Sequence, residues 1–381
     1  MGSIAPYSTT AGKRYRVRYR RPDGSQTDKR GFRTKRDAEV FLASVEVSKA
    51  QGTFVDPSRS RVTITHLAIP WLASKEASLK PSAYSPVETA WRLRVQPRWG
   101  RVMVTDIAHS DVKSWVAELN GSHGASVVIR TYGVLASILD DAVHDRRLAV
   151  NPARGGKIGL PKKIASRHIY LTHAQVENLA KASGEHATLV RTLAYTGMRW
   201  AEVSALTVQG IDFPRSRIWV VTNAVEVHGT IHVGTPKSHK IRSVPMPRFL
   251  RDELVGRTAR LSAEDLVFPS KGGTHMKRVR TSESSKSWFK SAAESIGVPH
   301  LHIHDLRHTA ASLAVQSGAN VKAIQRMLGH ASAAMTLDVY ADLFDDDLDA
   351  VSTALDQARS VQLDALRAMK QSDARPETLA D

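Results

Sequence analysis

The chain contains no cysteine, which excludes both a disulfide framework and thiolate chemistry. It also has no run of about 18 apolar residues, the length that a membrane-spanning helix requires, and no apolar signal-peptide segment near its start. The phosphate-loop pattern of Gly, four residues and then Gly-Lys-Ser/Thr is missing as well. These absences predict a cytoplasmic protein without a membrane span, and they give no sign of ATP chemistry.

Acidic residues are scarce relative to basic ones. The 381 residues include 54 Lys and Arg against 37 Asp and Glu, which gives a net charge of +17. Such an excess points to a polyanionic partner, most often nucleic acid, although a soluble basic protein without one is the plainer alternative. With 42% hydrophobic residues the chain can bury real cores, and its length suggests two or three domains.

The N-terminal segment alternates basic and apolar residues. Tyr15, Val17 and Tyr19 separate a series of arginines, which predicts a strand with one apolar and one basic face. Thr34 can cap a helix running from about Lys35 to Ala50. A small sheet on one helix results, and its basic face fits a DNA groove; a merely solvated strand face is the alternative. The basic residues concerned are Arg14, Arg16, Arg18, Arg20, Lys29, Arg30 and Arg33.

The next part of the chain reads as helical. From residue 63 to 150 apolar residues recur at spacings of three and four, which is typical of helices. Four tryptophans in this range are predicted to fill a core rather than to stack on a cofactor: Trp71, Trp91, Trp99 and Trp115. Segments 52–61 and 150–163, rich in Gly and Pro, are predicted linkers. Residues 166–365 mix helices with three short strands between 217 and 246.

Two short motifs could carry chemistry. Gly197 permits a tight turn into a helix on which Arg199 and Glu202, three residues apart, share one face. Taken alone, this pair is more simply interpreted as a surface ion pair. Lys237 lies where two predicted strands connect, and a lysine on such a turn is usually only solvated. Neither motif identifies a function by itself.

A third motif, "LHIHDLRHTAASLAVQSG", places His304, Arg307 and His308 on the first turn of an otherwise apolar helix. Three side chains that can carry positive charge repel one another, so an anion is expected among them. A metal site is the alternative, because His300 and His302 lie nearby. However, the Glu of helical zinc proteases is missing, and Arg307 would repel a cation. We therefore predict no metal at this site.

Together these motifs resemble the tyrosine recombinase, or phage integrase, family. "TGMRWAEVSAL" (196–206), the lysine at 237, "HDLRHTAAS" (304–312), "LGH" (328–330) and "MTLDVYA" (335–341) occur in the order and rough spacing of that family. Each motif is weak alone, but five in order are highly specific.

The resemblance implies catalytic roles for the matching residues. Tyr340 would be the nucleophile, and Arg199 and Arg307 would hold the scissile phosphate with bidentate geometry. A phenol has a pKa of about 10, so a base and a positive site must help it react. Lys237 would be the general acid that protonates the leaving 5′-hydroxyl.

The remaining matching residues would support this chemistry. The resemblance implies that His304 and His330 complete phosphate binding and proton transfer. Glu202 would buttress the first arginine, and His308 would be structural, packing beneath the active-site helix. The resemblance implies no cofactor, because a phosphotyrosine link conserves the energy of the ester without metal or ATP.

The resemblance spans nearly the whole chain and implies a multidomain fold. It implies a small α+β arm-type DNA-binding domain (1–56), an all-α core-binding domain (57–155) and a mainly α catalytic domain with a small antiparallel sheet (156–365). Residues 366–381 are expected to form a flexible tail.

By the same resemblance, the protein is expected to be a site-specific DNA recombinase that integrates and excises phage DNA through a 3′-phosphotyrosine intermediate. Its partners would be double-stranded DNA with core-type and arm-type attachment sites, other copies of itself in a homotetramer, a host DNA-bending protein and a recombination directionality factor. It would act at the nucleoid of a bacterial host. A non-catalytic DNA-binding regulator and a DNA-relaxing relative of type IB topoisomerases are the alternatives, and a mobile element other than a phage stays open as its source.

The chain ends with an acidic run and a helical pattern. "DLFDDDLDA" (342–350) carries five Asp and no base. It could bind Mg²⁺ as in metal-dependent nucleases, but such a run more often caps a helix N-terminus. Residues 346–362 are predicted to form an amphipathic helix. The resemblance implies that this helix packs on a neighbouring protomer; packing within its own chain is the alternative.

Overall fold

The computed structural model describes residues 2–22, 24–52, 54–55, 59–164, 168–235, 241–282, 284–340 and 348–373. The chain divides into two compact units, Met1–Ala165 and Ser166–Asp381. Among the described residues, no helix combines the length and the apolar composition that crossing a membrane would require.

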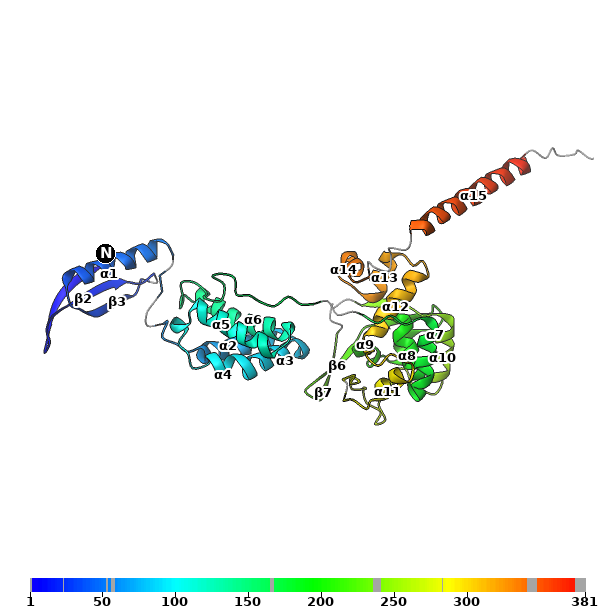
Figure 1. Ribbon diagram of the computed structural model, residues 1–381, viewed down its shortest axis with the longest axis horizontal. Helices are drawn as coiled ribbons and strands as arrows, with labels where there is room; N and C mark the ends of the chain where they lie inside the picture. Colours follow the sequence, from blue (N-terminus) through cyan, green and yellow to red (C-terminus); the bar gives the residue numbers. More distant parts are fainter. Residues whose placement is uncertain are drawn as a thin grey trace, which may run out of the picture. The chain divides into compact units, whose positions relative to one another are not determined.

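The first unit begins with a three-stranded antiparallel sheet. Its strands β1 (Ser3–Thr9), β2 (Gly12–Arg20) and β3 (Gln26–Phe32) lie in that order, and α1 (Lys35–Ala50) packs on β2 (Figure 1). The Thr34 hydroxyl accepts from the Asp37 main-chain N–H (3.1 Å), which confirms the predicted cap and helix start. The strand β1 was not predicted.

The central strand of this sheet buries one face. Val17 and Tyr19 are 0% and 5% exposed and pack against Ala38 and Val45 of α1. Because side chains alternate along a strand, the arginines of β2 lie on the opposite face. The predicted division into an apolar and a basic face is therefore confirmed.

A bundle of helices follows in the first unit. It consists of α2 (Ile64–Ser78), α3 (Pro81–Ala90), the π-helical turn η1 (Trp91–Val95), α4 (Gln96–Trp99), the 3₁₀ turn η2 (Val104–Asp106), α5 (His109–Ser122) and α6 (Ala125–His144). The four tryptophans are at most 6% exposed, as predicted. The rings of Trp99 and Trp115 pack edge to face, with their centroids 5.6 Å apart.

Part of the predicted second linker belongs to this helical core. The Asn151 side chain donates to the Ala136 main-chain oxygen (2.9 Å), and Ala153 and Ile158 are buried in the core. The segment looked free because Pro and Gly break its periodicity. Its few apolar side chains nevertheless complete the bundle, so the prediction of a wholly extended linker from residue 150 was wrong.

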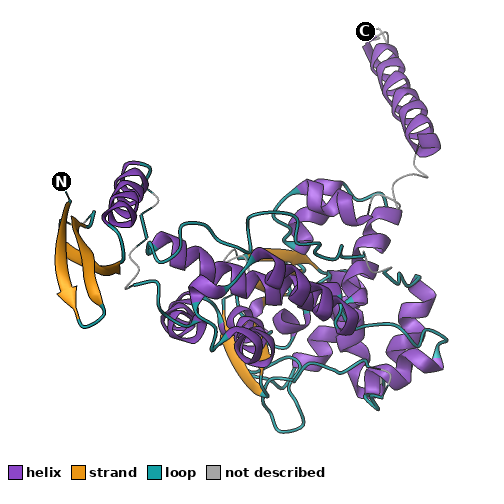
Figure 2. Ribbon diagram, turned by 60° about the vertical axis from the view of Figure 1, so that its left-hand side comes forward, coloured by secondary structure: helices purple, strands orange, loops and turns teal. Residues whose placement is uncertain are grey.

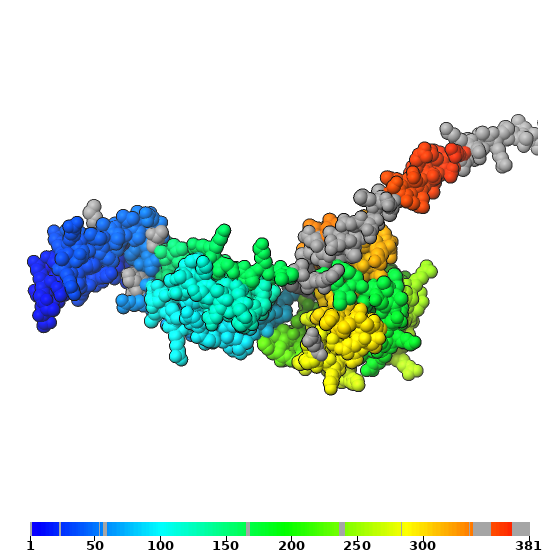
Figure 3. Space-filling model, in the orientation of Figure 1, coloured from blue at the N-terminus to red at the C-terminus, as the bar shows by residue number. Residues whose placement is uncertain are grey.

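The second unit is mainly helical (Figure 2). Its elements outside the sheets are α7 (His173–Ala182), η3 (Gly184–His186), α8 (Ala187–Thr196), α9 (Trp200–Val203), η4 (Val208–Gly210), α10 (Arg248–Thr258), α11 (Trp288–Ser295), α12 (Asp305–Gln316), α13 (Val321–Leu328), α14 (Ala333–Tyr340) and α15 (Leu348–Asp373). The helix α8 packs against both α7 and α12. In the space-filling view the segment around α11 (yellow) lies beside α7 and α8 (green) (Figure 3).

Strands in this unit form two separate sheets. The strands β4 (Ile211–Asp212), β5 (Arg217–Val220) and β8 (Arg242–Pro245) form one, and β6 (Asn223–Val227) and β7 (Thr230–Gly234) form a hairpin. Lys237 was predicted where two strands connect, on a hairpin turn. In sequence it does fall between β7 and β8, but the expected hairpin was wrong, because β7 pairs with β6 and β8 pairs with β5.

The reason lies in a turn and in burial. His228 and Gly229 both have positive φ (50° and 81°), the geometry of a tight two-residue hairpin turn, so β7 folds back on β6. Ile218 of β5 and Val244 of β8 face each other and are both 0% exposed, which fixes the other sheet in the core.

The architecture agrees with the predicted fold class: a small antiparallel sheet with a helix, then helices, then a mainly helical unit with small sheets. The C-terminal end differs from the prediction. The helix α15 continues to Asp373, so residues 366–373, expected in a flexible tail, are helical. Residues 363–373 are rich in good helix formers and contain neither Gly nor Pro, which allows the helix to continue.

Candidate active site

Arg199 is held at the start of α9 by a buried carboxylate. Gly197 ends α8 in the left-handed conformation (φ +63°) and turns the chain toward Arg199. The Arg199 main-chain N–H donates to Glu202 Oε2 (2.8 Å), and its Nη1 donates to Oε1 (2.9 Å). Glu202 is only 3% exposed, so this is no ordinary surface ion pair. The carboxylate fixes the direction of a guanidinium that still reaches solvent.

Glu202 has a second partner, Arg242 on β8. Arg242 Nη1 donates to Glu202 Oε1 (2.9 Å) and its Nη2 donates to Oε2 (2.7 Å). Burial by itself raises the pKa of Glu202, but the hydrogen bonds and charge of Arg242, aided by Arg199, outweigh it and lower that pKa. The carboxylate therefore stays ionised at neutral pH.

Arg307 lies in the first turn of α12 and is 3% exposed. Its Nη1 donates to the Gly197 main-chain oxygen and its Nη2 to the Leu328 oxygen, both at 2.6 Å. The guanidinium thus ties α12 to the turn before Arg199 and to the end of α13. Sequence analysis expected a DNA phosphate beside this cation and did not anticipate these carbonyls, which orient the guanidinium plane.

The two histidines at the start of α12 have different environments. His304 precedes the helix and is exposed, whereas His308 is buried and its ring stacks on His168 with centroids 3.8 Å apart. Loss of water around the ring, then the charges of Arg307 and Arg278, lower the pKa of His304. Burial, followed by the neighbouring histidines, lowers the pKa of His308 to about 3. Its packing fits the structural role predicted for it.

His330 follows Gly329, which ends α13 in the left-handed conformation (φ +66°). Its Nδ1 hydrogen-bonds the hydroxyl of Thr336 on α14 (2.9 Å), and Thr336 is 0% exposed. This contact fixes the ring orientation. Burial, followed by the charges of Arg307 and Arg199, lowers the pKa of His330 to about 4. The imidazole is therefore neutral at pH 7.

A basic cavity opens beside these residues. It has a volume of about 320 Å³ and is lined by Arg199, His304 and Arg278, among others. Glu226 Oε2 accepts from the Arg278 main-chain N–H (3.2 Å), which ties the loop before α11 to β6. The Arg199 guanidinium, held by Glu202, lines this cavity together with the exposed Arg278, and such a pair suits a phosphate group.

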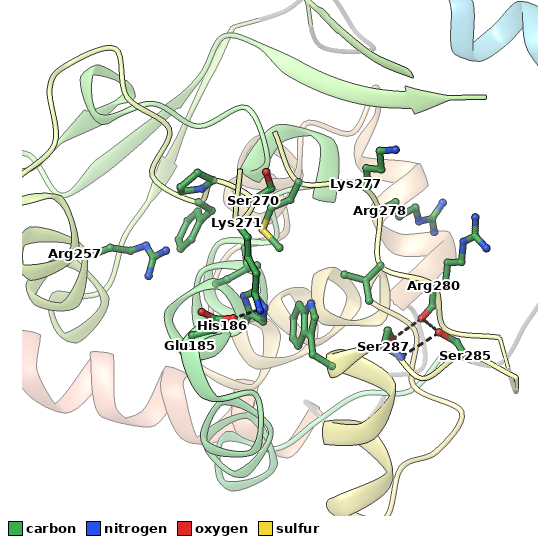
Figure 4. A pocket seen from close by; sticks show the side chains of 16 residues that line it. Glu185, His186, Arg257, Ser270, Lys271, Lys277, Arg278, Arg280, Ser285 and Ser287 are labelled. Atoms are coloured by element: carbon green, nitrogen blue, oxygen red, sulfur yellow. Dashed lines mark hydrogen bonds and ion pairs between the residues drawn. The ribbon is translucent and has the colours of Figure 1, made fainter. Parts of the chain in front are cut away.

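A larger hollow of about 630 Å³ shares Arg278 with this cavity. Figure 4 shows Lys277, Arg278 and Arg280 extending from one segment in broadly the same direction. His186 lies deeper, its ring 4.3 Å from that of Trp288. The basic surface therefore continues from the cavity along the loop that leads to α11.

Two of the expected catalytic groups cannot be placed in the site. Lys237 lies outside the described residues, in the segment 236–240. Tyr340 is the last residue of α14, but its side chain lies outside the described part. The helix α14 packs on α13. The acidic residues 345–347 lie outside the described residues as well.

The predicted DNA-binding residues of the N-terminal sheet are in the first unit. The arginines at 14, 16, 18 and 20 share the face of β2 opposite α1, and Arg33 is exposed just before α1. Arg30 pairs with Asp28 (2.8 Å). Lys29 differs, because its register partner is Val17 and its ammonium lies 4.4 Å from the centroid of Phe41. It therefore belongs to the helix-covered side of the sheet.

One group of possible metal ligands occurs within the described chain. His168, Asp305 and His308 have ligand atoms within 4.8 Å of one another. The two imidazoles stack nearly parallel, at 21°, and their lone pairs lie in the ring planes, so they do not converge on one point. The geometry gives no reason to assign a metal, and its absence stays a prediction.

Sequence analysis missed three residues of the site: Arg242, Thr336 and Arg278. Arg242 contacts Glu202 across 40 residues of sequence, so local patterns give no sign of the pair. Thr336 lies inside the "MTLDVYA" motif and its distance of six residues from His330 was a usable signal. Arg278 belongs to a basic run, 277–280, that could have been noticed.

Comparisons with known proteins point to one family. Residues 170–346 match the model described as "Phage integrase family". The integrase of Mycobacterium phage D29 is 27% identical over 325 residues, which cover 81% of this chain and 84% of that protein. A XerC-like tyrosine recombinase of Caldanaerobacter subterraneus is 24% identical over 338 residues, covering 81% of this chain and 86% of that protein.

Solved structures share the fold. The Tn1549 transposon integrase in complex with circular intermediate DNA matches with a TM-score of 0.65 and 21% identity, covering 77% of this chain and 100% of that chain. A lambda integrase dimer bound to a COC′ core site matches with a TM-score of 0.56 and 15% identity over 88% of this chain and 93% of that chain. A lambda integrase tetramer bound to a Holliday junction matches with a TM-score of 0.56 and 14% identity, covering 86% and 96%.

Proposed function

Because the chain belongs to the phage integrase family of tyrosine recombinases and is a site-specific DNA recombinase, we propose that Tyr340 is its nucleophile. The phenolic oxygen attacks a backbone phosphorus, the bond to the 5′ oxygen breaks, and a 3′-phosphotyrosine link forms. The phenolic proton passes to a nearby base, and the leaving 5′ oxygen takes a proton from Lys237. Supporting this role, Tyr340 closes α14, the helix that also carries the Thr336 contact to His330.

The scissile phosphate would be held by Arg199 and Arg307, with His304 and His330 beside it. One observation carries this proposal: Arg307 donates to the main-chain oxygens of Gly197 and Leu328, in the turns that lead to Arg199 and His330, so groups from three distant motifs gather in one place. In keeping with this geometry, the charges of Arg307, Arg199 and His304 each lower the pKa of His330. Such a concentration of positive potential is costly in the free protein and favourable once a phosphate enters. The negative charge that grows on the phosphate oxygens during attack would be stabilised most.

The histidines would act as proton carriers as well as phosphate ligands. Both imidazoles are neutral at pH 7 in the free protein, since their pKa values are lowered. A bound phosphate anion would offset the charge of the arginines and raise both pKa values. Either ring could then accept the phenolic proton of Tyr340 at neutral pH.

We further propose that the protein recognises two kinds of attachment site. The arginine face of β2 would bind arm-type DNA, and the helices α2–α6 together with the second unit would bind the core site. This division corresponds to domains 1–56, 57–155 and 156–365. It is supported by two separate apolar cores within residues 1–165, each able to order one binding surface.

Recombination would proceed in a homotetramer. A lambda integrase tetramer bound to a Holliday junction has a similar fold. In this chain the helix α15 exposes two large apolar side chains, Leu355 and Val361, which are 67% and 69% exposed. We propose that this helix packs on a neighbouring protomer. A host DNA-bending protein and a directionality factor would complete the assembly, which would work on phage DNA at the bacterial nucleoid.

A covalent-adduct assay tests the function. The wild-type chain is incubated with a nicked core-site DNA, from which the cleaved end diffuses away, and then denatured with SDS. We expect a protein–DNA adduct from the wild type and none from Tyr340→Phe, which should still shift core DNA in a native gel. Adducts from Tyr340→Phe would refute the nucleophile. A wild type that binds DNA tightly but never forms adducts would favour the regulator.

A further inference from the structure

Arg242 joins two parts of the site that lie far apart in sequence. All the nitrogens of its guanidinium donate to protein groups: Nη1 and Nη2 to the Glu202 carboxylate, and Nε to the Met327 main-chain oxygen (3.0 Å). Its side chain is only 10% exposed. An arginine that is used in this way cannot itself grip DNA, so its contribution must come through the groups that it holds.

One of these groups leads to Arg199. The carboxylate that receives Arg242 also receives the main-chain N–H and Nη1 of Arg199. A single buried acid thus stands between two guanidiniums and determines their separation. If Arg242 moves, Glu202 loses its stronger partner, and the direction of Arg199 is no longer fixed.

The other contact leads to His330. Met327 lies in the last turn of α13, two residues before Gly329, whose left-handed conformation turns the chain to His330. A Cβ atom added at Gly329 would lie 2.9 Å from Arg242 Cδ, so the arginine side chain packs directly over this turn. The position of the His330 turn and the position of Arg199 therefore depend on the same side chain.

We propose that Arg242 is a positioning residue for strand cleavage: it sets the distance between the Arg199 guanidinium and the His330 imidazole. This inference rests on the proposed phosphate-binding role of both residues. Only arginine offers a planar fork for a carboxylate plus a third N–H at a fixed angle, so lysine cannot replace it fully.

The test compares cleavage with binding in the full-length chain. Arg242→Gln and Arg242→Lys are assayed on saturating nicked core-site DNA for the single-turnover rate of adduct formation, and on the same DNA for Kd. Displacing catalytic groups by about 1 Å can cost about 100-fold in rate. We expect a loss of about that size for Gln, a smaller loss for Lys, and a Kd within about threefold of wild type, since a displaced catalytic group changes the geometry of attack rather than the contacts that bind DNA. Arg217→Gln, an exposed arginine on the neighbouring strand β5, is the matched control and should cleave normally.

A double variant separates positioning from folding. Arg242→Gln alone leaves the Glu202 charge buried with a single partner, so the protein should lose stability. In Glu202→Gln/Arg242→Gln both charges are gone and the thermal midpoint should largely recover. Cleavage should stay low, because neither the Glu202 carboxylate nor Arg242 is then present to hold Arg199 and the His330 turn in place. Recovery of rate together with the midpoint, or normal cleavage by Arg242→Gln, would overturn the proposal. An error in the proposed function itself would be detected separately, because Tyr340→Phe would then still form adducts.

Discussion

Glu202 shows at the scale of a single residue how burial and charge constrain this site. Glu202→Ala would leave the Arg242 guanidinium, 10% exposed, without its carboxylate. Breaking a buried ion pair by removing one partner costs about 3–5 kcal/mol. We expect a loss of this size in the free energy of unfolding, measured by urea titration of the full-length chain.

The control for this prediction is an exposed pair in the same unit. Asp252 accepts from Arg251 (2.8 Å), and its side chain is 65% exposed. Asp252→Asn should cost less than about 1 kcal/mol, because solvent screens exposed pairs. Equal losses in the two variants would show that Glu202 is not held in a dry environment.

Histidine protonation gives a second prediction at this scale. Burial is the largest cause that lowers the pKa of His308 to about 3 and of His330 to about 4. In the unfolded chain both imidazoles have a pKa of about 6.5. Between the folded-state and unfolded-state pKa values, the unfolded chain binds more protons than the folded chain. The stability that these neutral histidines contribute is therefore fully present above about pH 6.5 and is lost as the pH falls toward about 4.

We expect the free energy of unfolding to decrease over this window by up to about 1.4 kcal/mol per pH unit for each proton taken up. Urea titrations at several pH values measure the slope. His308→Gln should reduce the slope relative to the wild type. An unchanged slope in this variant would contradict the assignment to buried histidines.

Single residues also show the limits of sequence analysis. The motifs identified Arg199, His304, Arg307 and His330 because their order along the chain is distinctive. The motifs did not reveal that Arg307 would donate to the carbonyls of Gly197 and Leu328. Such contacts arise from the packing of α8, α12 and α13, which no local pattern encodes.

At the scale of elements, prediction succeeded where the signals are local. The helix α1 begins and ends as predicted, because a capping residue and an apolar periodicity mark it within 16 residues. The strands β1 and β4 were missed, since β1 contains a proline and is mostly exposed and β4 has only two residues. The strand β6 was missed as well, although it is as long as β7, which was predicted. The division of the second unit into two sheets depends on which strands meet in the core, so it required the structure.

A helix end supplies the prediction at this scale. Gly329→Ala would introduce left-handed strain at φ +66° and place a methyl group 2.9 Å from Arg242 Cδ. Gly318→Ala, at φ +73° after α12, brings the same kind of strain, but its added Cβ would meet nothing within 4 Å. Left-handed conformation costs a non-glycine residue about 1–2 kcal/mol.

We therefore expect both glycine variants to lose stability through the strain, Gly329→Ala the more because Arg242 must also shift. Only Gly329→Ala should lose adduct formation by a further factor of about 10 or more, since small displacements of catalytic groups are costly. Thermal unfolding and the nicked-DNA assay measure the two effects. If Gly318→Ala lost cleavage to the same extent, strain in a helix end, and not the contact with Arg242, would be the cause.

At the scale of the whole molecule, the net charge of +17 includes basic surfaces in both units. The arginines of β2 face away from α1, whereas the residues around Arg199 belong to the second unit. The sequence could predict the basic face of β2, because it lies within one continuous segment, whereas the basic residues around Arg199 come from distant parts of the chain. How the units together hold DNA is not encoded in such segments, and it remains a proposal.

The basic face of β2 provides the prediction at this scale. Arg18 and Arg20 are exposed on it, and replacing both by Gln removes two charges while leaving the buried Val17 and Tyr19 in place. Each phosphate contact contributes about 0.9 to the slope of log affinity against log salt concentration. For DNA flanking the integration site, we expect weaker binding and a slope smaller by about 2, with unchanged cleavage of nicked core DNA.

A control of equal charge decides whether the face matters or only the total charge. Lys35 and Arg36 are exposed at the start of α1, on the other side of the sheet, so their double Gln variant has the same net charge as the Arg18 and Arg20 variant. If β2 binds arm-type DNA, the control should keep its salt slope. Equal slopes for the two variants would mean that the first sheet attracts DNA only through its overall charge. The proposed arm-type role would then be wrong, whereas the proposed chemistry of the second unit would be unaffected, because core cleavage is measured separately.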